Sequence, residues 1–548
     1  MRSPLVPARA ILVSLLALVA AVACAAPVPA SPTSAPAAAT SAPTAATGAQ
    51  PVNGAPKRGG TAVVAVDADP ETLNPGITTS NVTGDIQAKV FEGLVWLDQN
   101  FTPQPALATS WQISPDGRTV TFKLRPNVKW HDGQDFTSAD VKYTFEEILA
   151  KFQPRTSTTF KQLELKVDAP DPLTAALTLK QGYAPLLMQM SVFEAPIMPM
   201  HLYQGTDAST NPANQAPVGT GPFKFAEWNH GSTIKVVRND QYWDSSKPYL
   251  DGIIFQVVPQ APNRSSGLET GEIDFVLDFY LPKADVGRLS SNTNLTSKRG
   301  QGAPAIDFLM MNLKNPILAN KQVRQALAMA INRDTQVQQA MAGLGRPGYG
   351  AFGDGFKWLL NPDVSYQKLY PFSVEQSQQL LGGASLPANT TLRLTYDAAR
   401  ANLGTGAQII KDNLRQVGIN VDLQPLERAV MLDKVFTQKD FDLTLQSYFS
   451  SGDPSVGYHR LYLTNTGTAP FVNASGYSNP QVDDLLAKAS TQDERAPIYK
   501  QLQAILNDDL PALVLYDEAG VDFATTKLSG LWTSIDSRNR WDVVSLSQ

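Results

Sequence analysis

Apolar residues recur with two periods along the chain, a period of two in some stretches and of three to four in others. The run TAVVAV at 61–66 predicts a strand, and the chain then turns at Asn74-Pro75. Residues 114–130, SPDGRTVTFKLRPNVKW, alternate apolar and polar positions after an Asp-Gly turn, which predicts a β-hairpin. Short strands joined by tight turns are therefore expected in this part of the chain.

Helical periodicity follows the hairpin and recurs toward the end of the chain. Residues 137–149 predict a helix that Thr137 or Ser138 caps, with Asp140 in its first turn. The other predicted elements are helices at 86–97, 323–331, 407–417 and 498–505, and strands at 392–395, 419–423 and 441–446. Helices that alternate with short strands indicate an α/β fold.

The first residues carry a different pattern, a basic start followed by an uncharged apolar run. Arg2 and Arg9 precede Ile11–Ala23, which as a helix would span about 20 Å, less than the roughly 30 Å of a bilayer core. These features predict a secretory signal over residues 1–24. Because Ala21 to Cys24 resembles the bacterial lipobox, we expect lipidation of Cys24, the single cysteine of the chain. The alternative is cleavage by the ordinary signal peptidase.

Composition separates a linker from the folded part of the chain. Residues 25–56 carry no charge and consist almost entirely of Ala, Pro, Ser, Thr, Val and Gly, which predicts a disordered linker. Residues 57–548 exceed the usual size of one domain, so two or three domains are expected. The net charge of −5 and the lack of a basic run argue against a nucleic-acid partner.

Motifs that suggest catalysis or cofactor binding have simpler explanations. His131 in WHDG has no second His at ligand spacing, so this motif is expected to form a turn. Residues 343–348 match GxGxxG but follow a helical run and contain Pro347, which would interrupt a helix. The 4 histidines are scattered, and neither HExxH nor GxSxG occurs. The sequence therefore favours no enzyme, cofactor or metal site, although a hydrolase with paired carboxylates stays open.

Five sequence blocks follow one another in a fixed order along the chain. They are PALATSWQISPDGRTVTFKLRPNVKWHDGQDFTSADVKYTFE at 105–146, VGTGPFKFAEWNHGSTIKVVRNDQYWDSSKPYLDGIIF at 218–255, GEIDF at 271–275, VRQALAMAINRD at 323–334 and FDLTLQSYFSSGDPS at 441–455. Together they resemble the extracytoplasmic solute-binding proteins of peptide-type ABC importers, the dipeptide, oligopeptide and nickel-binding group (bacterial solute-binding protein family 5). Within the second block, Tyr242 and Trp243 are expected to pack inside their lobe.

The resemblance implies a two-lobed α/β fold of the periplasmic-binding-protein type, class II, with an additional small domain and hinge segments between the lobes. It also implies the domain boundaries. Lobe I is expected to comprise residues 57–93, 175–285 and 515–548, the small domain 94–174, and lobe II 286–514.

The charged anchors of peptide-binding relatives are missing from their expected positions. In those relatives, the loop after the strand at 441–446 carries an Asp that pairs with the ligand amine, but Ser450 occupies this position. Asp453 matches a different residue of the motif. Dipeptide binders also place an Arg two residues before Tyr396, where this chain has Leu394, so Arg400 is the nearest substitute. An unpaired charged terminus in a closed cleft costs several kcal/mol, which weakens the case for a free dipeptide.

Further candidate ligand-binding residues come from aligned loops. Tyr448 and Phe449 would suit stacking on a peptide or a sugar, with core packing as the alternative. Thr79, Ser80 and Asn81 match a loop that reaches the ligand in relatives, with a turn cap as the alternative.

We therefore expect a lipid-anchored, monomeric, extracytoplasmic substrate-binding component of an ABC importer. It would capture an oligopeptide between closing lobes and deliver it to permease subunits. The alternatives are the same role for an oligosaccharide or another ligand without a free amine, a sensor or chaperone of the same fold, and a secreted hydrolase.

Overall fold

Three hydrophobic cores, each built on its own β-sheet, make up the described part of the chain. The computed structural model describes residues 56–547 apart from 154–155, 300–303, 385, 388, 451, 466, 468–470 and 492–493. The signal, Cys24 and nearly all of the linker predicted from the sequence lie outside these residues.

Lobe I is the part of the chain that surrounds a seven-stranded mixed sheet. The strand order is β12-β19-β11-β1-β10-β9-β8, and β1 pairs in parallel with both β10 and β11. Its strands are β1 (Thr61–Val66), β8 (Phe223–Asn229), β9 (Thr233–Arg238), β10 (Gly252–Val257), β11 (Phe275–Val276), β12 (Leu295–Arg299) and β19 (Val521–Thr525). Its helices include α1 (Asn81–Val90), α4 (Met200–Tyr203), α5 (Ala261–Thr270) and α6 (Val286–Ser290). A two-stranded antiparallel sheet of β20 (Leu528–Ser529) and β21 (Ser545–Leu546) completes this part, and a second one, of β2 (Val95–Leu97) and β3 (Pro103–Pro105), leads into the small domain.

The small domain surrounds a four-stranded antiparallel sheet in the order β4-β5-β7-β6. Its elements are β4 (Ala108–Ile113), β5 (Thr119–Leu124), α2 (Ser138–Tyr143), which continues as a π-helix over Thr144–Leu149, α3 (Ser157–Gln162), β6 (Lys166–Asp171) and β7 (Thr174–Thr178). Its core extends from Leu94 to Ile197. The boundary expected at residue 174 therefore falls inside β7, which pairs with both β5 and β6.

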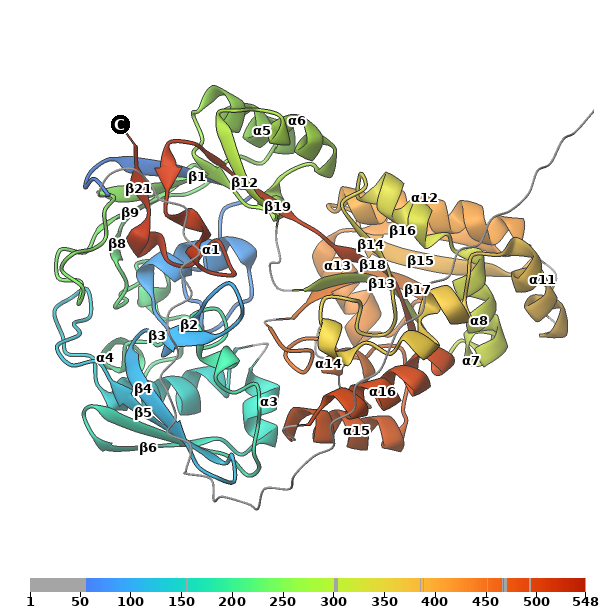
Figure 1. Ribbon diagram of the computed structural model, residues 1–548, viewed down its shortest axis with the longest axis horizontal. Coiled ribbons are helices and arrows are strands. Elements are labelled where there is room, and N and C mark those ends of the chain that lie inside the picture. Colours follow the sequence, from blue (N-terminus) through green and yellow to red (C-terminus); the bar gives the residue numbers. More distant parts are fainter. Residues whose placement is uncertain are drawn as a thin grey trace, which may run out of the picture. The chain divides into compact units, whose positions relative to one another are not determined.

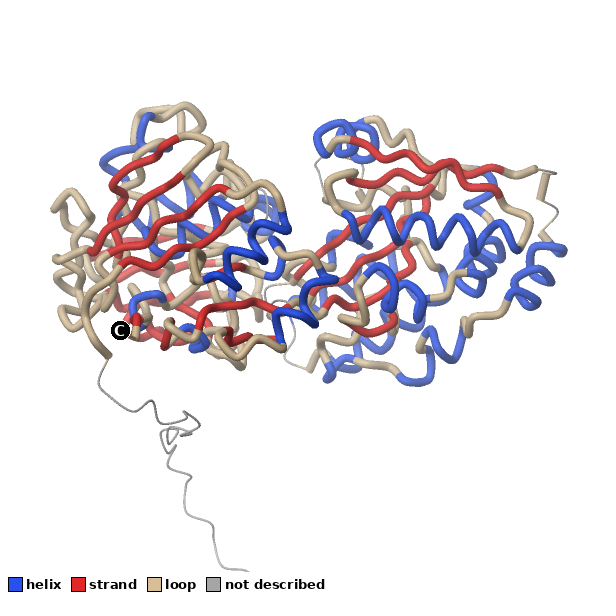
Figure 2. The backbone as a smooth tube through the Cα atoms, turned by 90° about the horizontal axis from the view of Figure 1, so that it is seen from above, coloured by secondary structure: helices blue, strands red, loops and turns tan. Residues whose placement is uncertain are grey.

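Lobe II surrounds a six-stranded sheet in the order β14-β18-β13-β17-β15-β16. Its strands are β13 (Ala305–Met311), β14 (Gly345–Pro347), β15 (Thr391–Asp397), β16 (Asn420–Leu426), β17 (Leu443–Phe449) and β18 (Ala512–Glu518). Its helices are α7 (Pro316–Ala319), α8 (Lys321–Ala330), α9 (Arg333–Thr335), α10 (Tyr366–Leu369), α11 (Val374–Gly383), α12 (Ala401–Gln416), α13 (Arg428–Leu432), α14 (His459–Tyr462), α15 (Pro480–Thr491) and α16 (Ala496–Asp509). The central strands β13 and β18 are buried, whereas the edge strand β16 is partly exposed, and helices lie alongside the sheet (Figure 2).

One strand passes directly from lobe II into lobe I. β18 ends at Glu518, and only Ala519 and Gly520 separate it from β19 (Figure 1). A Cβ atom at Gly520 would lie 1.9 Å from Oδ2 of Asp278, so an alanine here would have to displace the Asp278 carboxylate. The crossing therefore lies close to the segment that follows β11.

Most predicted elements are confirmed, with one clear error. The strand at 61–66, the hairpin around Asp116-Gly117 and the helix that follows Thr137 are present. The helix expected at 86–97 is wrong at both ends, because α1 covers Asn81–Val90 and residues 95–97 form β2. The break falls at Gly93, where a Cβ atom would lie 2.4 Å from the Met190 carbonyl oxygen.

Candidate functional site

The two lobes present the carboxyl ends of parallel strands toward the same crossing. In lobe II, β15, β16, β17 and β18 run in one direction and end on one edge of the sheet, where β13 begins. In lobe I, β1 and β11 end on the edge where β19 begins. Since β18 and β19 are joined by two residues, these edges lie near each other. Ligands of open α/β sheets bind at such edges, so this is the candidate site.

The predicted residues of lobe I lie at the start of α1. Thr79, Ser80 and Asn81 are each half-buried, and Ser80 is the N-cap residue of α1 without a side-chain capping bond. The backbone N–H of Ser80 donates a local hydrogen bond to the Thr78 hydroxyl at 3.1 Å. The side chains of this loop therefore keep hydroxyl and amide groups next to the strand edge.

Tyr396 and Arg400 lie at the end of β15 and the start of α12. Tyr396 is buried, with its ring near Gly404, while Arg400 is the N-cap residue of α12. The Arg400 side chain is 36% exposed and its Nη2 lies 3.4 Å from Oε1 of Glu518. Arg400 is thus a cation that a solute can reach, and its ion-pair partner lies on the crossing strand.

The other predicted residues of lobe II are largely engaged in packing. Tyr448 is buried, and its ring lies edge-on to Phe308 at 4.9 Å between centroids. Phe449 is half-buried at the end of β17. Ser450 is fully buried and donates its hydroxyl to the carbonyl of Asp453.

Asp453 forms a buried ion pair within lobe II. Its two carboxylate oxygens accept from Nη1 and Nη2 of Arg495 at 2.5 and 2.6 Å. Oδ1 also accepts from the backbone N–H of Ser455 at 2.9 Å. Asp453 is therefore neutralised by a residue of its own lobe.

Sequence reasoning missed the group of charges around Arg400. Asp307 on β13, Glu518 on β18 and Lys283 of lobe I lie around its guanidinium. Lys283 pairs with Asp278 through Nζ and Oδ2 at 3.1 Å. The available signal was a charged residue inside the apolar strand AIDFLMM, which a buried strand does not usually contain.

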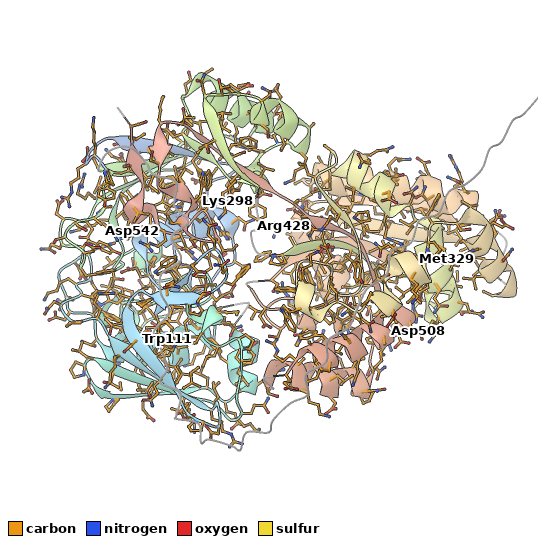
Figure 3. All side chains as sticks on the ribbon, in the orientation of Figure 1. Trp111, Lys298, Met329, Arg428, Asp508 and Asp542 are labelled. Atoms are coloured by element: carbon orange, nitrogen blue, oxygen red, sulfur yellow. The ribbon has the colours of Figure 1, made fainter. Side chains whose placement is uncertain are left out.

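Charges of both lobes act on one carboxyl group near the end of β1. Asp67 follows β1, and Arg428 begins α13 of lobe II. Burial raises the pKa of Asp67, while the charges of Arg264 and Arg428 oppose this rise. Figure 3 labels Arg428 on the face of lobe II that carries the candidate site.

The motifs for which a structural role was expected have one. The ring of His131 accepts from the N–H of Gly219 at 3.2 Å and contacts the carbonyl of Gly221 at 3.0 Å, and burial lowers its pKa to about 4. Tyr242 and Trp243 both donate to Glu92 at 3.0 Å, but the ring of Trp243 packs against the core of the small domain rather than inside lobe I. Residues 345–347 form β14 rather than a phosphate-binding loop.

The described residues were also compared with the requirements of a membrane-spanning helix and of a metal-binding cluster. No helix among residues 56–547 combines the length and hydropathy needed to cross a bilayer. No group of three or more His, Cys, Asp or Glu side chains in the same part of the chain has a geometry suited to a metal ion.

Comparison with known proteins gives one family. The family model "Bacterial extracellular solute-binding proteins, family 5 Middle" matches residues 102–469. The glutathione-binding protein GsiB of Escherichia coli (strain K12) is 27% identical over 488 residues, which cover 87% of this chain and 92% of GsiB.

Solved structures show the same fold. AgaA of A. tumefaciens R10, in complex with agropinic acid, is 25% identical with a TM-score of 0.77, over 89% of this chain and 99% of AgaA. The oligopeptide-binding protein AppA of Bacillus subtilis, in complex with a nonapeptide, is 23% identical with a TM-score of 0.77, over 90% of this chain and 100% of AppA. Both match this chain over nearly their whole length.

Proposed function

Because this chain belongs to the bacterial extracellular solute-binding proteins of family 5, we propose that it captures a peptide-type solute outside the cytoplasmic membrane and delivers it to an ABC permease. The observation that carries the proposal is the family match over residues 102–469. The named relatives are binding proteins, so the proposed role is capture and release of an intact solute, with ATP hydrolysed by other subunits.

The arrangement of the strands supports capture by closure. The ends of β1 and β11 and the ends of β15, β17 and β18 adjoin one short crossing, so a rotation at Ala519-Gly520 would move the two strand edges together. A solute held between the edges would be removed from water, which strengthens its hydrogen bonds and ion pairs. Closure would thus give the loaded protein a shape that a permease can distinguish from that of the empty protein.

Several features support a peptide with a free carboxylate as the leading ligand class. GsiB is named for glutathione, and AppA was solved with a nonapeptide. In this chain the partly exposed side chain of Arg400 suits a carboxylate, because Arg binds carboxylates through parallel N–H donors. Arg400 would therefore hold the carboxylate, with Thr79, Ser80 and Asn81 available for hydrogen bonds from lobe I.

A ligand without a free amine is the second candidate. Ser450 is uncharged and buried, and Asp453 is paired with Arg495, so neither offers a free carboxylate to an amine. A sugar or another ligand of this kind would need stacking and hydrogen bonds only.

The mode of attachment belongs to the same proposal. A lipid on Cys24 and the uncharged linker over residues 25–56 would hold a monomer at the outer face of the membrane while leaving it free to rotate. Labelling with a radioactive fatty acid, compared between the natural chain and Cys24→Ala, tests the anchor.

Native mass spectrometry of residues 57–548, purified without refolding, tests the function. We expect a bound solute that is released intact on unfolding and identified as a peptide. Release of a sugar would show that the proposed ligand class is wrong, while the transport role would stand. Conversion of added peptide to fragments would contradict the role of a binding protein.

A further inference from the structure

A cavity lies at the opposite end of α1 from the candidate site. The candidate site adjoins Asn81 at the start of this helix, whereas the cavity is lined by Phe91, which follows the last helical residue. The 10 residues of α1 span about 15 Å as a helix, so the two places are separate. Figure 3 labels Asp542 of the cavity wall well away from Arg428 of the candidate site. The cavity encloses about 190 Å³, compared with the roughly 150 Å³ of a cavity that binds benzene.

Three tryptophans contribute to the wall of this α1 cavity. Trp96 on β2 and Trp243 are half-buried, and Trp541 is buried. Each ring already has a cation near it: the guanidinium of Arg540 is 4.2 Å from the centroid of Trp96, that of Arg125 is 3.8 Å from Trp243, and Nζ of Lys89 is 4.8 Å from Trp541. A cationic ligand would be repelled by these charges, whereas a neutral ring can stack on an indole.

The charged groups of the wall are engaged with groups of the protein. Arg540 donates through Nε and Nη2 to the two oxygens of Asp542 at 2.9 and 3.1 Å. Nζ of Lys247 lies 3.1 Å from Asp244 and 3.3 Å from Asp542. Glu92 accepts from the two aromatic donors described above. An ionic ligand would therefore have to compete with a contact that the wall already makes.

One polar side chain of the wall differs from these groups. Asn539 is only 6% exposed, and its side-chain amide makes no hydrogen bond among residues 56–547 that the structure describes. Its backbone N–H is used, because it donates to the Asp536 carbonyl at 3.0 Å. Buried side-chain amides normally have hydrogen-bond partners. The amide of Asn539 thus leaves a donor and an acceptor for whatever occupies the cavity.

We propose that the α1 cavity binds a planar, uncharged aromatic amide, of which nicotinamide is a simple example. The ring of the ligand stacks on the indole of Trp96. Its amide N–H donates to the side-chain carbonyl of Asn539 and its carbonyl accepts from the Asn539 NH₂ group, as in other paired amide contacts. This site is additional to the proposed capture of a solute between the lobes, which does not require it.

A bound ring would also join two parts of the fold. Val95 of β2 belongs to the core of the small domain, and Trp243 packs against the same core. Phe91 and Trp541 belong to the core of lobe I. Because the cavity is lined by residues of both groups, its ligand should stabilise the junction between lobe I and the small domain.

Three analogues of nearly equal size test the ligand class. Nicotinamide, nicotinate and 1-methylnicotinamide, which are neutral, anionic and cationic, are titrated into the full chain, and binding is followed by ligand-observed NMR. We expect nicotinamide to bind with a Kd on the order of 1 mM or less. Both charged analogues should bind at least about tenfold more weakly. Equal binding of the three would overturn the inference, as would a lack of nicotinamide binding up to about 10 mM, which would mean that water alone fills the cavity.

Variants of the wall test the location of the site. Asn539→Leu removes both amide groups at similar volume, and Trp96→Leu removes the stacking surface, so each should weaken nicotinamide binding by about tenfold or more. Two controls should leave it unchanged. Asn263→Leu replaces an exposed residue of α5, and Trp358→Leu replaces an exposed tryptophan of lobe II whose ring also has a guanidinium near it, that of Arg495 at 5.4 Å.

Unchanged nicotinamide binding in both wall variants would overturn the inference, because the ring would then bind elsewhere. Circular dichroism shows whether each variant is folded. If a wall variant does not fold, the three analogues on the natural chain still decide the question. Solute capture is measured separately by native mass spectrometry, so the failure of either proposal leaves the other intact.

Discussion

Some buried charged residues have their charge fully paired within one lobe. Others lie at the candidate site with an incomplete set of partners. Arg495 and Asp453 form a bidentate pair whose side chains are almost fully buried. Arg400 and Asp307, in contrast, lie at the strand edge with incomplete partners. Full pairing within a lobe indicates a role in stability, and incomplete pairing at the edge indicates a role in binding.

Removing one member of the balanced pair should destabilise lobe II. Arg495→Met leaves the buried carboxylate of Asp453 without a cation, so the free energy of unfolding should fall by about 3–5 kcal/mol. Urea denaturation followed by circular dichroism measures the loss. Lys488→Met, which breaks the exposed pair with Asp484, is the control and should change stability by less than about 1 kcal/mol. Equal losses would contradict the assignment.

Glu92 should make the stability of lobe I depend on pH. Burial raises its pKa to about 7, although hydrogen bonds from Trp243 and Tyr242 oppose the rise. The folded pKa exceeds the unfolded value of 4.5, so this stabilisation is full below that value and is lost as the pH rises toward 7.

Glu92→Gln removes the titrating group and keeps an acceptor for both donors. The variant should therefore be less stable than the natural chain by a larger margin at pH 5 than at pH 8, with a slope of at most about 1.4 kcal/mol per pH unit. Thermal unfolding at both pH values measures the margin, with the exposed Glu272→Gln as the control. A margin that grows with pH would refute the assignment.

At the scale of elements, the pattern of apolar and polar residues predicted the strands and turns that depend only on neighbouring residues. The strand at 61–66 and the hairpin at 114–130 follow from alternation and an Asp-Gly turn, both of which act over a few residues. The end of α1 did not follow, because a loop far along the chain determines it. Asp307 was missed for the same reason, since only strand pairing brings β13 beside β18.

The loop at 218–222 needs glycine because it lies against the end of α1. A Cβ atom at Gly219 would lie 1.8 Å from the carbonyl oxygen of Val90. Gly219→Ala should therefore lower the free energy of unfolding by about 3 kcal/mol, measured in urea. Gly382→Ala in α11 has no atom within 4 Å and should leave stability unchanged or raise it by about 0.5–1 kcal/mol. An unaffected Gly219 variant would show that the loop is free to move.

At the scale of the whole molecule, the blocks at 105–455 identified the family and the two-lobed class of fold. They could not show which side chains meet between the lobes, because those contacts depend on the crossing at Ala519-Gly520. Arg400 was proposed only as the nearest substitute for the Arg that relatives carry near Tyr396, and its charged neighbours come from strands separated from it by about a hundred residues or more in sequence.

Closure about the crossing should change the size of the protein in solution. A bound peptide is expected to reduce the radius of gyration measured by small-angle X-ray scattering. Gly520→Ala places a methyl group against Asp278 and should weaken both the contraction and the affinity. Gly382→Ala serves again as the control. A natural chain that binds peptide without contracting would contradict closure.

The place of β19 in lobe I also sets the order in which the protein can be completed during synthesis. β19 lies between β11 and β12, which are made more than two hundred residues earlier. The sheet of lobe II has all its strands at residue 518, whereas the sheet of lobe I stays divided until residue 525. A nascent chain therefore carries every strand of the second lobe's sheet before the sheet of the first lobe is joined, and no solute can be enclosed before residue 525 has been made.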